Sequence, residues 1–330
     1  MVYELYYKAF ETFRRVPVIR TVEDNERYCK ILGETLKEHL AVIPNLVMGV
    51  LQCQELMPAD DMDQFVHAML RARISRRVIA EQHLALNETF NSPWHVPQTS
   101  SENDFVGEVL LRCNAKEVIQ RCGKVAQELC TSPDGTGPMV PEVKVVGHTE
   151  ATFPYVLSHL EYIIGEILRN SIQAVMEKHQ DLKKPPPPIE VLVCEAQQQV
   201  IIRFSDQGGG IPRDILPFLW SFNKGPRSAE RMQSLSQVPI LAATMQEVQH
   251  PLVNKTKAKV RDSSLSTLAS RPPSLRLGMG LPMSKVYAEY WAGNLELHSL
   301  EGYGVDAFLQ ISKLGNQNEQ LTSRASIDAV

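Results

Sequence analysis

Three short motifs in the second half of the chain constrain the fold more than any other feature of the sequence. Glu166 and Asn170 form a Glu-x-x-x-Asn pair within a segment of helical character. An Asp-x-Gly-x-Gly turn at 206–210 directly follows a β-rich run, and a Gly-x-Gly turn at 278–280 precedes a second helical segment. Each motif alone is common in proteins. Their fixed order along one chain is what makes the set informative.

The two glycine turns have residue types that suit a nucleotide. Asp206 stands at the end of the run Val200 to Phe204 and offers acceptors for an exocyclic amine, while the glycines after it let the backbone approach a ligand. Glycines at a helix N-terminus, as at Gly278 and Gly280, expose N–H groups that suit a phosphate. A hairpin turn with a capping Asp is the alternative for the first turn, and a lone Gly-x-Gly is weak evidence.

Glu166 and Asn170 stand four residues apart and therefore share one helix face, with Arg169 beside them. An Asn carbonyl oxygen is a good Mg²⁺ ligand, and a Glu one turn away can orient or deprotonate a hydroxyl. The alternative is an ordinary solvated polar face. The order of the three motifs favours the catalytic interpretation.

Apolar residues recur at helical spacing through the first 130 residues, and the connections between the runs are short. Four amphipathic helices joined by short connections predict a four-helix bundle. The predicted helices are Val2–Phe13, Glu26–Leu51, Asp61–Leu86 and Ala115–Cys130.

After a Pro- and Gly-rich segment the sequence contains short runs rich in β-forming residues, with helical segments between them. This pattern predicts a sheet with helices on one face. The predicted strands are Val143–Val146, Ile189–Cys194, Val200–Phe204, Asn294–Ser299 and Val305–Ile311. The predicted helices are Ser158–His179, capped at Ser158 by a Ser-x-x-Glu pattern, and Leu281–Trp291.

The expected architecture is therefore a two-domain α+β chain. A helical bundle domain spans 1–132, a linker 133–141, and an α/β sandwich domain 142–330. The long polar segment 222–275 is locally basic and is expected to be a mobile lid.

Composition limits the classes of function. The chain has 330 residues, with 34 Lys and Arg against 38 Asp and Glu, a net charge of −4. That balance does not fit a surface devoted to nucleic acid or anionic lipid. No apolar stretch reaches the roughly 20 residues that cross a bilayer, and the six cysteines show no CxxC pair or Cys/His cluster.

The ordered set resembles the GHKL superfamily, whose members share a Bergerat α/β sandwich ATP-binding domain. The resemblance implies that Asp206 reads the adenine amine, that Asn170 holds Mg²⁺, and that the lid wraps the phosphates. The residues that it assigns to ATP binding are Glu166, Asn170, Asp206, Gly208, Gly210, Gly278, Met279, Gly280 and Leu281.

Within that superfamily the chain is similar to the mitochondrial 2-oxoacid dehydrogenase kinases, through segments 37–39, 73–77, 81–84 and 281–290. The lid, with Gly-Pro-Arg-Ser at 225–228, looks like that of a fungal pyruvate dehydrogenase kinase. The resemblance implies an ATP- and Mg²⁺-dependent serine kinase that phosphorylates and inactivates an E1 component, most of all pyruvate dehydrogenase. It also implies a lipoyl-bearing E2 partner, a homodimer and the mitochondrial matrix.

In that mechanism Glu166 accepts the proton of the substrate serine and Arg169 lies near the transferred phosphoryl group. Three other interpretations stay open. Leu36 and Ala9 resemble the branched-chain 2-oxoacid dehydrogenase kinase. His39 in a His-x-x-x-x-Pro spacing allows a histidine kinase, and departures within the glycine motifs allow a nucleotide-binding scaffold.

Three cationic positions on the helices of the first domain predict a pocket for a 2-oxoacid. His39, Arg73 and Arg77 face a helical core, where a buried cation needs an anion or an acid as partner. An internal ion pair with Glu or Asp is nearly as good an explanation.

The chain also departs from the family pattern. Gln173 stands where relatives usually have Arg, Arg276 replaces a Gly, and Val305 replaces a Thr. These changes bear on lid closure and dimer coupling. Most members begin upstream of the position of Val2, so we expect the sequence to lack a transit peptide and the first regulatory helices.

Overall fold

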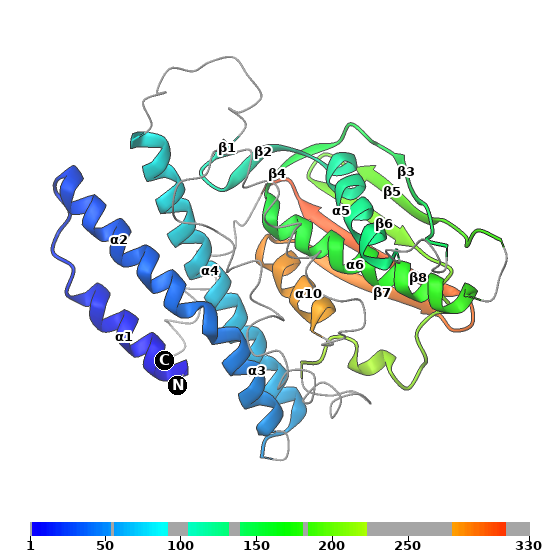
Figure 1. Cartoon of the computed structure of the whole chain (residues 1–330), viewed down its shortest axis with the longest axis horizontal. Helices are drawn as coiled ribbons and strands as arrows, with labels where there is room; N and C mark the ends of the chain where they lie inside the picture. Colours follow the sequence, from blue (N-terminus) through cyan, green and yellow to red (C-terminus); the bar gives the residue numbers. More distant parts are fainter. Residues whose placement is uncertain are drawn as a thin grey trace. The chain divides into compact units, whose positions relative to one another are not determined.

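Figure 1 shows the computed structural model of the chain, which describes residues 2–53, 56–91, 105–131, 139–180, 184–222 and 279–314. Contacts divide these residues into two compact units. The first contains the described residues up to Val109 together with Phe222, and the second contains Leu110–Ser221 and the described residues from 279 onward. The predicted linker 133–141 and lid 222–275 lie mostly outside the described residues, so both stay predictions.

The first unit is helical (Figure 1, blue to cyan). Its elements are α1 (Val2–Arg14), α2 (Val22–Glu38), the 3₁₀ turn η1 (His39–Ala41), α3 (Val42–Gln52), α4 (Ala59–Asn91) and the two-residue strand β1 (Phe105–Val106). The predicted four-helix bundle is not confirmed. The helix expected as its fourth member, α5 (Ala115–Cys130), belongs to the second unit and packs there on α6 and β3. An apolar stripe shows that a helix buries one face, but not which partner covers it.

The helix predicted over Glu26–Leu51 is divided in two at η1. Pro44 lies in the first turn of α3 and has no backbone N–H to donate to the carbonyl of Leu40. A continuous helix would therefore lose a hydrogen bond at this point, and the chain forms a 3₁₀ turn before α3 begins.

The start of α2 is fixed by a capping box. The Thr21 hydroxyl accepts from the Asp24 N–H at 3.2 Å, and the Asp24 carboxylate accepts from the Thr21 N–H at 3.1 Å. The next residue, Asn25, donates to the Asn87 side-chain oxygen on α4 at 2.6 Å. Leu32 of α2 then packs with Ala80 and Leu84 of α4 in a buried apolar cluster that joins these two helices.

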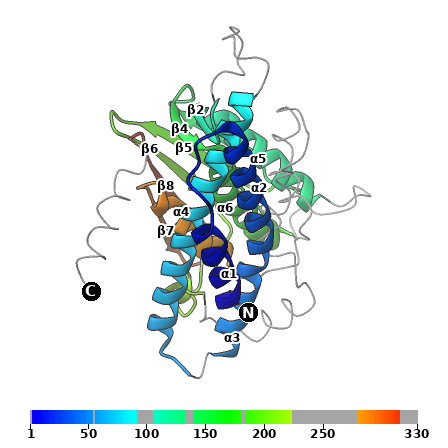
Figure 2. The ribbon, with the colours of Figure 1, turned by 90° about the vertical axis from the view of Figure 1, so that its left-hand side faces the viewer.

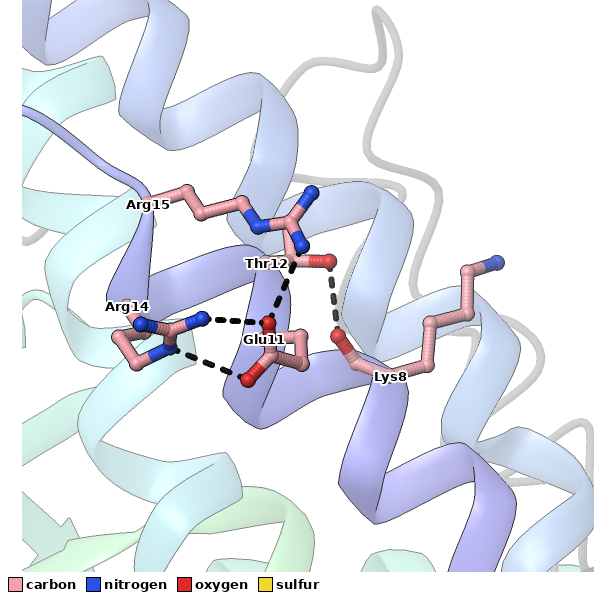
Figure 3. Close-up of polar contacts among 5 residues, drawn as sticks. All are labelled: Lys8, Glu11, Thr12, Arg14 and Arg15. Carbon is pink, nitrogen blue, oxygen red and sulfur yellow. Dashed lines mark hydrogen bonds and ion pairs between the residues drawn. The ribbon is translucent and has the colours of Figure 1, made fainter.

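The polar side of α1 is tied together by its own side chains (Figure 3). The Glu11 carboxylate accepts from Arg14 at 2.8 Å and from Arg15 at 3.2 Å, and the Thr12 hydroxyl donates to the Lys8 carbonyl at 2.8 Å. These contacts are exposed to solvent, where ion pairs add little stability. They lower the pKa of Glu11, chiefly through the Arg14 hydrogen bond.

The second unit is built on a five-stranded sheet of order β3-β5-β6-β8-β7. Its strands are β3 (Val143–Gly147), β5 (Ile189–Glu195), β6 (Gln199–Ser205), β7 (Asn294–Leu300) and β8 (Gly304–Ser312). β3 and β5 are parallel and the other pairs are antiparallel. All five were expected from the sequence to within a residue or two. The strands β2 (Val109–Asn114) and β4 (Thr152–Val156), which pair in a separate small sheet, were not.

Three helices cover one face of the large sheet: α5, α6 (Leu157–His179) and α10 (Gly280–Tyr290), as Figures 1 and 2 show. Alternate strand residues are buried beneath them, among them Val191, Ile202 and Leu309. The expected α+β architecture with helices on one face of the sheet is therefore confirmed for this unit.

The predicted cap at Ser158 is wrong. Helix α6 begins at Leu157, and its N-cap residue is Val156 without a side-chain hydrogen bond. Because β4 runs directly into α6, Ser158 already lies inside the first turn. Glu161, the expected second half of the capping box, is 1% exposed and instead pairs with Arg121 of α5 at 2.5 Å.

Among the described residues, no helix is long and apolar enough to span a membrane. The same residues hold no group of three His, Cys, Asp or Glu side chains arranged for a metal ion. All six cysteines are free thiols, and Cys113 and Cys122 are fully buried. Burial raises the pKa of Cys113 to about 12.

Candidate nucleotide site

Helix α6 carries the first group of predicted site residues, and it buries two of them as an ion pair. Glu166 is 1% exposed and Arg169 is 4% exposed. An Arg169 terminal nitrogen (Nη2) donates to Glu166 Oε2 at 2.6 Å. Asn170, the next residue, is half-buried, and its amide has no hydrogen-bond partner among the described residues. The Asn170 amide is therefore available to a ligand.

Asp206 stands immediately after β6 and is almost fully buried. Its Oδ1 accepts the N–H of Gly208 at 2.9 Å and that of Val305 at 3.3 Å, while Oδ2 accepts the Ser171 hydroxyl at 2.9 Å. Desolvation by burial raises the pKa of the Asp206 carboxyl, the negative charge of Asp306 adds to the rise, and the three hydrogen bonds oppose it. The carboxylate is therefore oriented from three directions.

The glycines after Asp206 are required by the packing. A side chain at Gly208 would overlap Ala174 on α6, so the loop can lie directly on the helix. Gly210 has φ of +74°, a conformation that costs other residues strain. These two positions explain the spacing of the Asp-x-Gly-x-Gly motif in physical terms.

Lys178, near the end of α6, holds the loop against the turn before β8. Its ammonium donates to the carbonyls of Gly302 and Tyr303 at 3.0 and 3.1 Å. Gly209 completes the contact by donating to Tyr303 O at 3.0 Å and accepting from Gly302 N at 2.7 Å. The turn at Gly302 and Tyr303 thus supports the Asp206 loop.

The start of α10 lies against Glu166. A Cβ built on Gly280 would overlap Glu166 Oε2, so only glycine allows this approach. The N-cap residue Met279 makes no side-chain cap, and Leu281 is half-buried. The first N–H groups of α10, with the positive end of its dipole, therefore lie beside the Glu166 carboxylate and are not capped by the side chain of Met279. Gly278 and Arg276 lie outside the described residues.

Comparison with known proteins shows which families the chain resembles. Residues 156–314 match the family model "Histidine kinase-, DNA gyrase B-, and HSP90-like ATPase", and residues 1–110 match "Mitochondrial branched-chain alpha-ketoacid dehydrogenase kinase". The mitochondrial pyruvate dehydrogenase (acetyl-transferring) kinase 2 of Saccharomyces cerevisiae is 32% identical, covering 97% of this chain and 71% of its own length. The chain belongs to the pyruvate dehydrogenase kinase family.

Other members of the family give the same result. The mitochondrial pyruvate dehydrogenase (acetyl-transferring) kinase of Arabidopsis thaliana is 29% identical over 96% of this chain and 76% of its own length. That of Schizosaccharomyces pombe is also 29% identical, over 78% of this chain and 52% of the relative. The resemblance inferred from the motifs is therefore confirmed.

The predicted 2-oxoacid residues lie in the helical unit, and the structure brings two of them together. Arg73 is 5% exposed and donates to the His39 carbonyl at 3.0 Å. His39 Nε2 lies 3.2 Å from the Leu5 carbonyl, and burial lowers the pKa of the imidazole. Arg77 pairs with Glu81 at 2.6 Å, which is the internal ion pair considered as the alternative.

Two residues of the site were not found from the sequence: Ser171 and Lys178. Ser171 interrupts an apolar run on the buried side of α6, and such a polar residue at a core position is a detectable signal. Lys178 gives no comparable signal, because an exposed lysine near a helix C-terminus is ordinary. Of the family departures, Val305 is explained, since its contact with Asp206 is made by the backbone.

Proposed function

We propose that the chain is an ATP-dependent protein serine kinase that phosphorylates and inactivates the E1 component of the pyruvate dehydrogenase complex in the mitochondrial matrix. The observation that carries the proposal is the meeting of Glu166 with the start of α10 and of α6 with the Asp206 loop, within one compact unit. Relatives named as mitochondrial pyruvate dehydrogenase kinases support it.

In this proposal the adenine amine donates to the Asp206 carboxylate, which is buried and already oriented. The phosphates bind the backbone N–H groups at Met279, Gly280 and Leu281, where the α10 dipole favours negative charge. Gly208 lets the loop lie on α6, and Gly210 lets it lie against the backbone of Leu300 at the end of β7. Gly278 belongs to the same motif.

Asn170 is the residue we assign to Mg²⁺. Its amide is half-buried and makes no hydrogen bond among the described residues, so its oxygen is available as a hard ligand. Mg²⁺ usually keeps several waters and is held by one or two protein oxygens together with substrate phosphates, which fits a single amide ligand. When bound, the ion would offset charge on the phosphate oxygens.

Glu166 is the proposed base for the serine hydroxyl. The adjacent Arg169 guanidinium favours the ionised carboxylate, the form that can accept a proton. Arg169 also supplies positive charge near the phosphoryl group, as the family resemblance implies. A carboxylate beside a helix N-terminus keeps the base and the proposed phosphate-binding N–H groups in one place.

We also propose the finer organisation that the family resemblance implies. The helices α1 to α4 would form the regulatory bundle, and His39, Arg73 and Arg77 would line an allosteric 2-oxoacid pocket within it. The lipoyl domain of E2 would recruit the kinase, and the sheet domains would pair as a homodimer. The relatives named as mitochondrial support that compartment.

The branched-chain 2-oxoacid dehydrogenase kinase is the second candidate, because the family model that covers residues 1–110 carries that description. The whole-length relatives favour pyruvate dehydrogenase instead. The deciding experiment is phosphorylation of purified pyruvate E1 and branched-chain E1 side by side with radiolabelled ATP. Faster serine labelling of pyruvate E1 supports the proposal, and faster labelling of branched-chain E1 overturns the choice of substrate.

The two remaining candidates are less well supported. A histidine kinase would use a ring nitrogen of His39 as the nucleophile. Nε2 faces the Leu5 carbonyl and must carry a proton to bond it, so this role would fall to Nδ1. A non-catalytic scaffold would not need a glycine at 280 to admit the Glu166 carboxylate. An acid-labile phosphate label on His39 would support the histidine kinase. ATP binding without phosphate transfer to either E1 would support the scaffold.

A further inference from the structure

Ser171 is the buried residue of the nucleotide site that no motif singles out. It follows Asn170 on α6, is 7% exposed, and donates its hydroxyl to Asp206 Oδ2 at 2.9 Å. The two residues are 35 positions apart in the sequence, so the bond joins α6 to the end of β6. It is the side-chain contact that links the helix carrying Glu166 and Asn170 to the predicted adenine-reading residue.

The free acceptor positions on Asp206 can be counted. Oδ1 already accepts two backbone N–H groups, from Gly208 and Val305. A carboxylate oxygen has about two lone pairs, so Oδ1 is filled. Among the described residues, Oδ2 accepts from Ser171 alone. One lone pair on Oδ2 is therefore left for a ligand, and it lies beside the Ser171 hydroxyl.

We propose that Ser171 is a positioning residue that holds Asp206 Oδ2 as the acceptor for the exocyclic amine of adenine and thereby sets the preference for adenine over guanine. This inference rests on the proposed use of ATP. It adds a determinant of base choice to the Asp-x-Gly-x-Gly motif, contributed by the helix rather than by the loop.

The physical reason lies in the protonation of a buried acid. Burial favours the neutral carboxyl, and so does the negative charge of Asp306 on β8, whereas hydrogen bonds from Ser171, Gly208 and Val305 favour the ionised form. Those are the groups of α6, the loop and β8 that act on Asp206 among the described residues. Removing the hydroxyl would raise the pKa of Asp206.

Base choice follows from that protonation state. An ionised carboxylate accepts from the amine at position 6 of adenine and repels the carbonyl oxygen at position 6 of guanine. A protonated carboxyl can instead donate to that carbonyl. Loss of the Ser171 hydroxyl should therefore lower the affinity for ATP and leave the affinity for GTP unchanged. ATP binding should also begin to fail at a higher pH as the solution is acidified.

The test is calorimetric titration of the full chain with MgATP and MgGTP between about pH 5.5 and pH 8. The variants are Ser171→Ala and, to restore a hydroxyl, Ser171→Thr. Ser158→Ala is the matched control, a half-buried serine on the same helix. We expect Ser171→Ala to lower the affinity for ATP about tenfold at neutral pH and to bring the affinities for ATP and GTP closer together. The pH profile of ATP binding should shift to higher pH. Threonine should recover most of the affinity.

A merely structural role predicts a different result. If Ser171→Ala weakens ATP and GTP equally with an unchanged pH profile, or leaves ATP binding intact, the positioning role is overturned. Should the alanine variant fail to fold, Ser171→Cys keeps the size with a weaker donor and must show the same narrowing. Wild-type binding of ATP without transfer to any E1 would refute the kinase activity but leave this inference standing.

Discussion

Glu166 and Arg169, one turn apart on α6, form an ion pair that is almost completely withdrawn from water, with nitrogen and oxygen 2.6 Å apart. Such a pair gains strong Coulomb attraction, but it forfeits the hydration of both charges. Stability alone therefore does not explain why this ion pair is buried. The position of Gly280 against the same carboxylate supplies one, because the pair fixes Glu166 at the start of α10.

Replacing Glu166 by Gln should separate binding from transfer. The amide oxygen can still accept from Arg169, but it cannot take the proton of a serine. We expect ATP affinity to change less than about threefold and the rate of E1 phosphorylation to fall about 10²- to 10⁴-fold. Single-turnover phosphorylation with saturating MgATP measures the second quantity. Full transfer by a variant that binds ATP would remove Glu166 from the role of base.

Replacing Arg169 by Met tests the electrostatic argument. The Glu166 carboxylate would stay buried without its arginine counter-charge, a loss that typically costs about 3–5 kcal/mol. Equilibrium urea unfolding should reveal this cost. Arg14→Met is the control, because its pair with Glu11 is exposed to solvent, where ion pairs add little stability. Equal effects of the two substitutions would contradict the assignment of Arg169 to a buried pair.

Replacing Gly280 by Ala should act on catalysis through geometry. The new methyl group would collide with Glu166 Oε2, so either the carboxylate or the start of α10 must move. A displacement of about 1 Å can cost about 10²-fold in rate, and we expect E1 phosphorylation to fall by at least tenfold. Gly49→Ala on α3 is the control, since nothing lies within 4 Å of its Cβ position. An unimpaired Gly280→Ala enzyme would show that this approach is not needed.

The share of the fold that could be predicted from the sequence differs between the two units. In strands such as Ile189–Glu195 and Gln199–Ser205, buried residues alternate with less buried ones, and that period is local, so the positions of these strands were predicted closely. β4 was missed because its five residues run straight into α6 without a turn signal. The helical pattern likewise located α5 and α6 but did not show that they pack together. Periodicity carries no information about which surface covers an apolar stripe.

The site shows the same division. Glu166, Asn170 and the glycines were found because their spacing is a local signal, and Gly280 proved to have a steric reason for being glycine. Ser171 and Lys178 act through contacts with residues 35 and more than 120 positions away. Contacts of that range depend on the packing of α6 against the sheet and could not be deduced from spacing alone.

The proposed 2-oxoacid pocket predicts different effects of substituting its two arginines. Arg73 is buried beside His39, whereas Arg77 is paired with Glu81. Pyruvate at millimolar concentration should therefore raise the melting temperature of the wild type and of Arg77→Gln, but not that of Arg73→Gln. An anion here would favour the protonated form of His39, whose pKa burial now lowers, so the effect should grow as the pH falls. Loss of the response in Arg77→Gln alone would reverse the assignment.

Asp206 should make stability and nucleotide binding respond to pH in opposite directions. Burial raises the pKa of its carboxyl in the folded chain, so the folded state binds this proton more tightly than the unfolded state does. The contribution of Asp206 to stability is then fully present below the unfolded pKa and is lost as the pH rises through the folded pKa. ATP binding needs the ionised form and follows the reverse course.

Asp206→Asn separates these two effects. Its amide oxygen can accept from Gly208 and Val305 while its NH₂ donates to the Ser171 hydroxyl, so the apo variant should melt about 2–4 °C higher near pH 8, for roughly 1 kcal/mol gained. The same NH₂ opposes the adenine amine, and MgATP should no longer raise the melting temperature. Thermal denaturation with and without MgATP at about pH 6 and pH 8 measures both. A variant that MgATP still stabilises would show that Asp206 does not read the base.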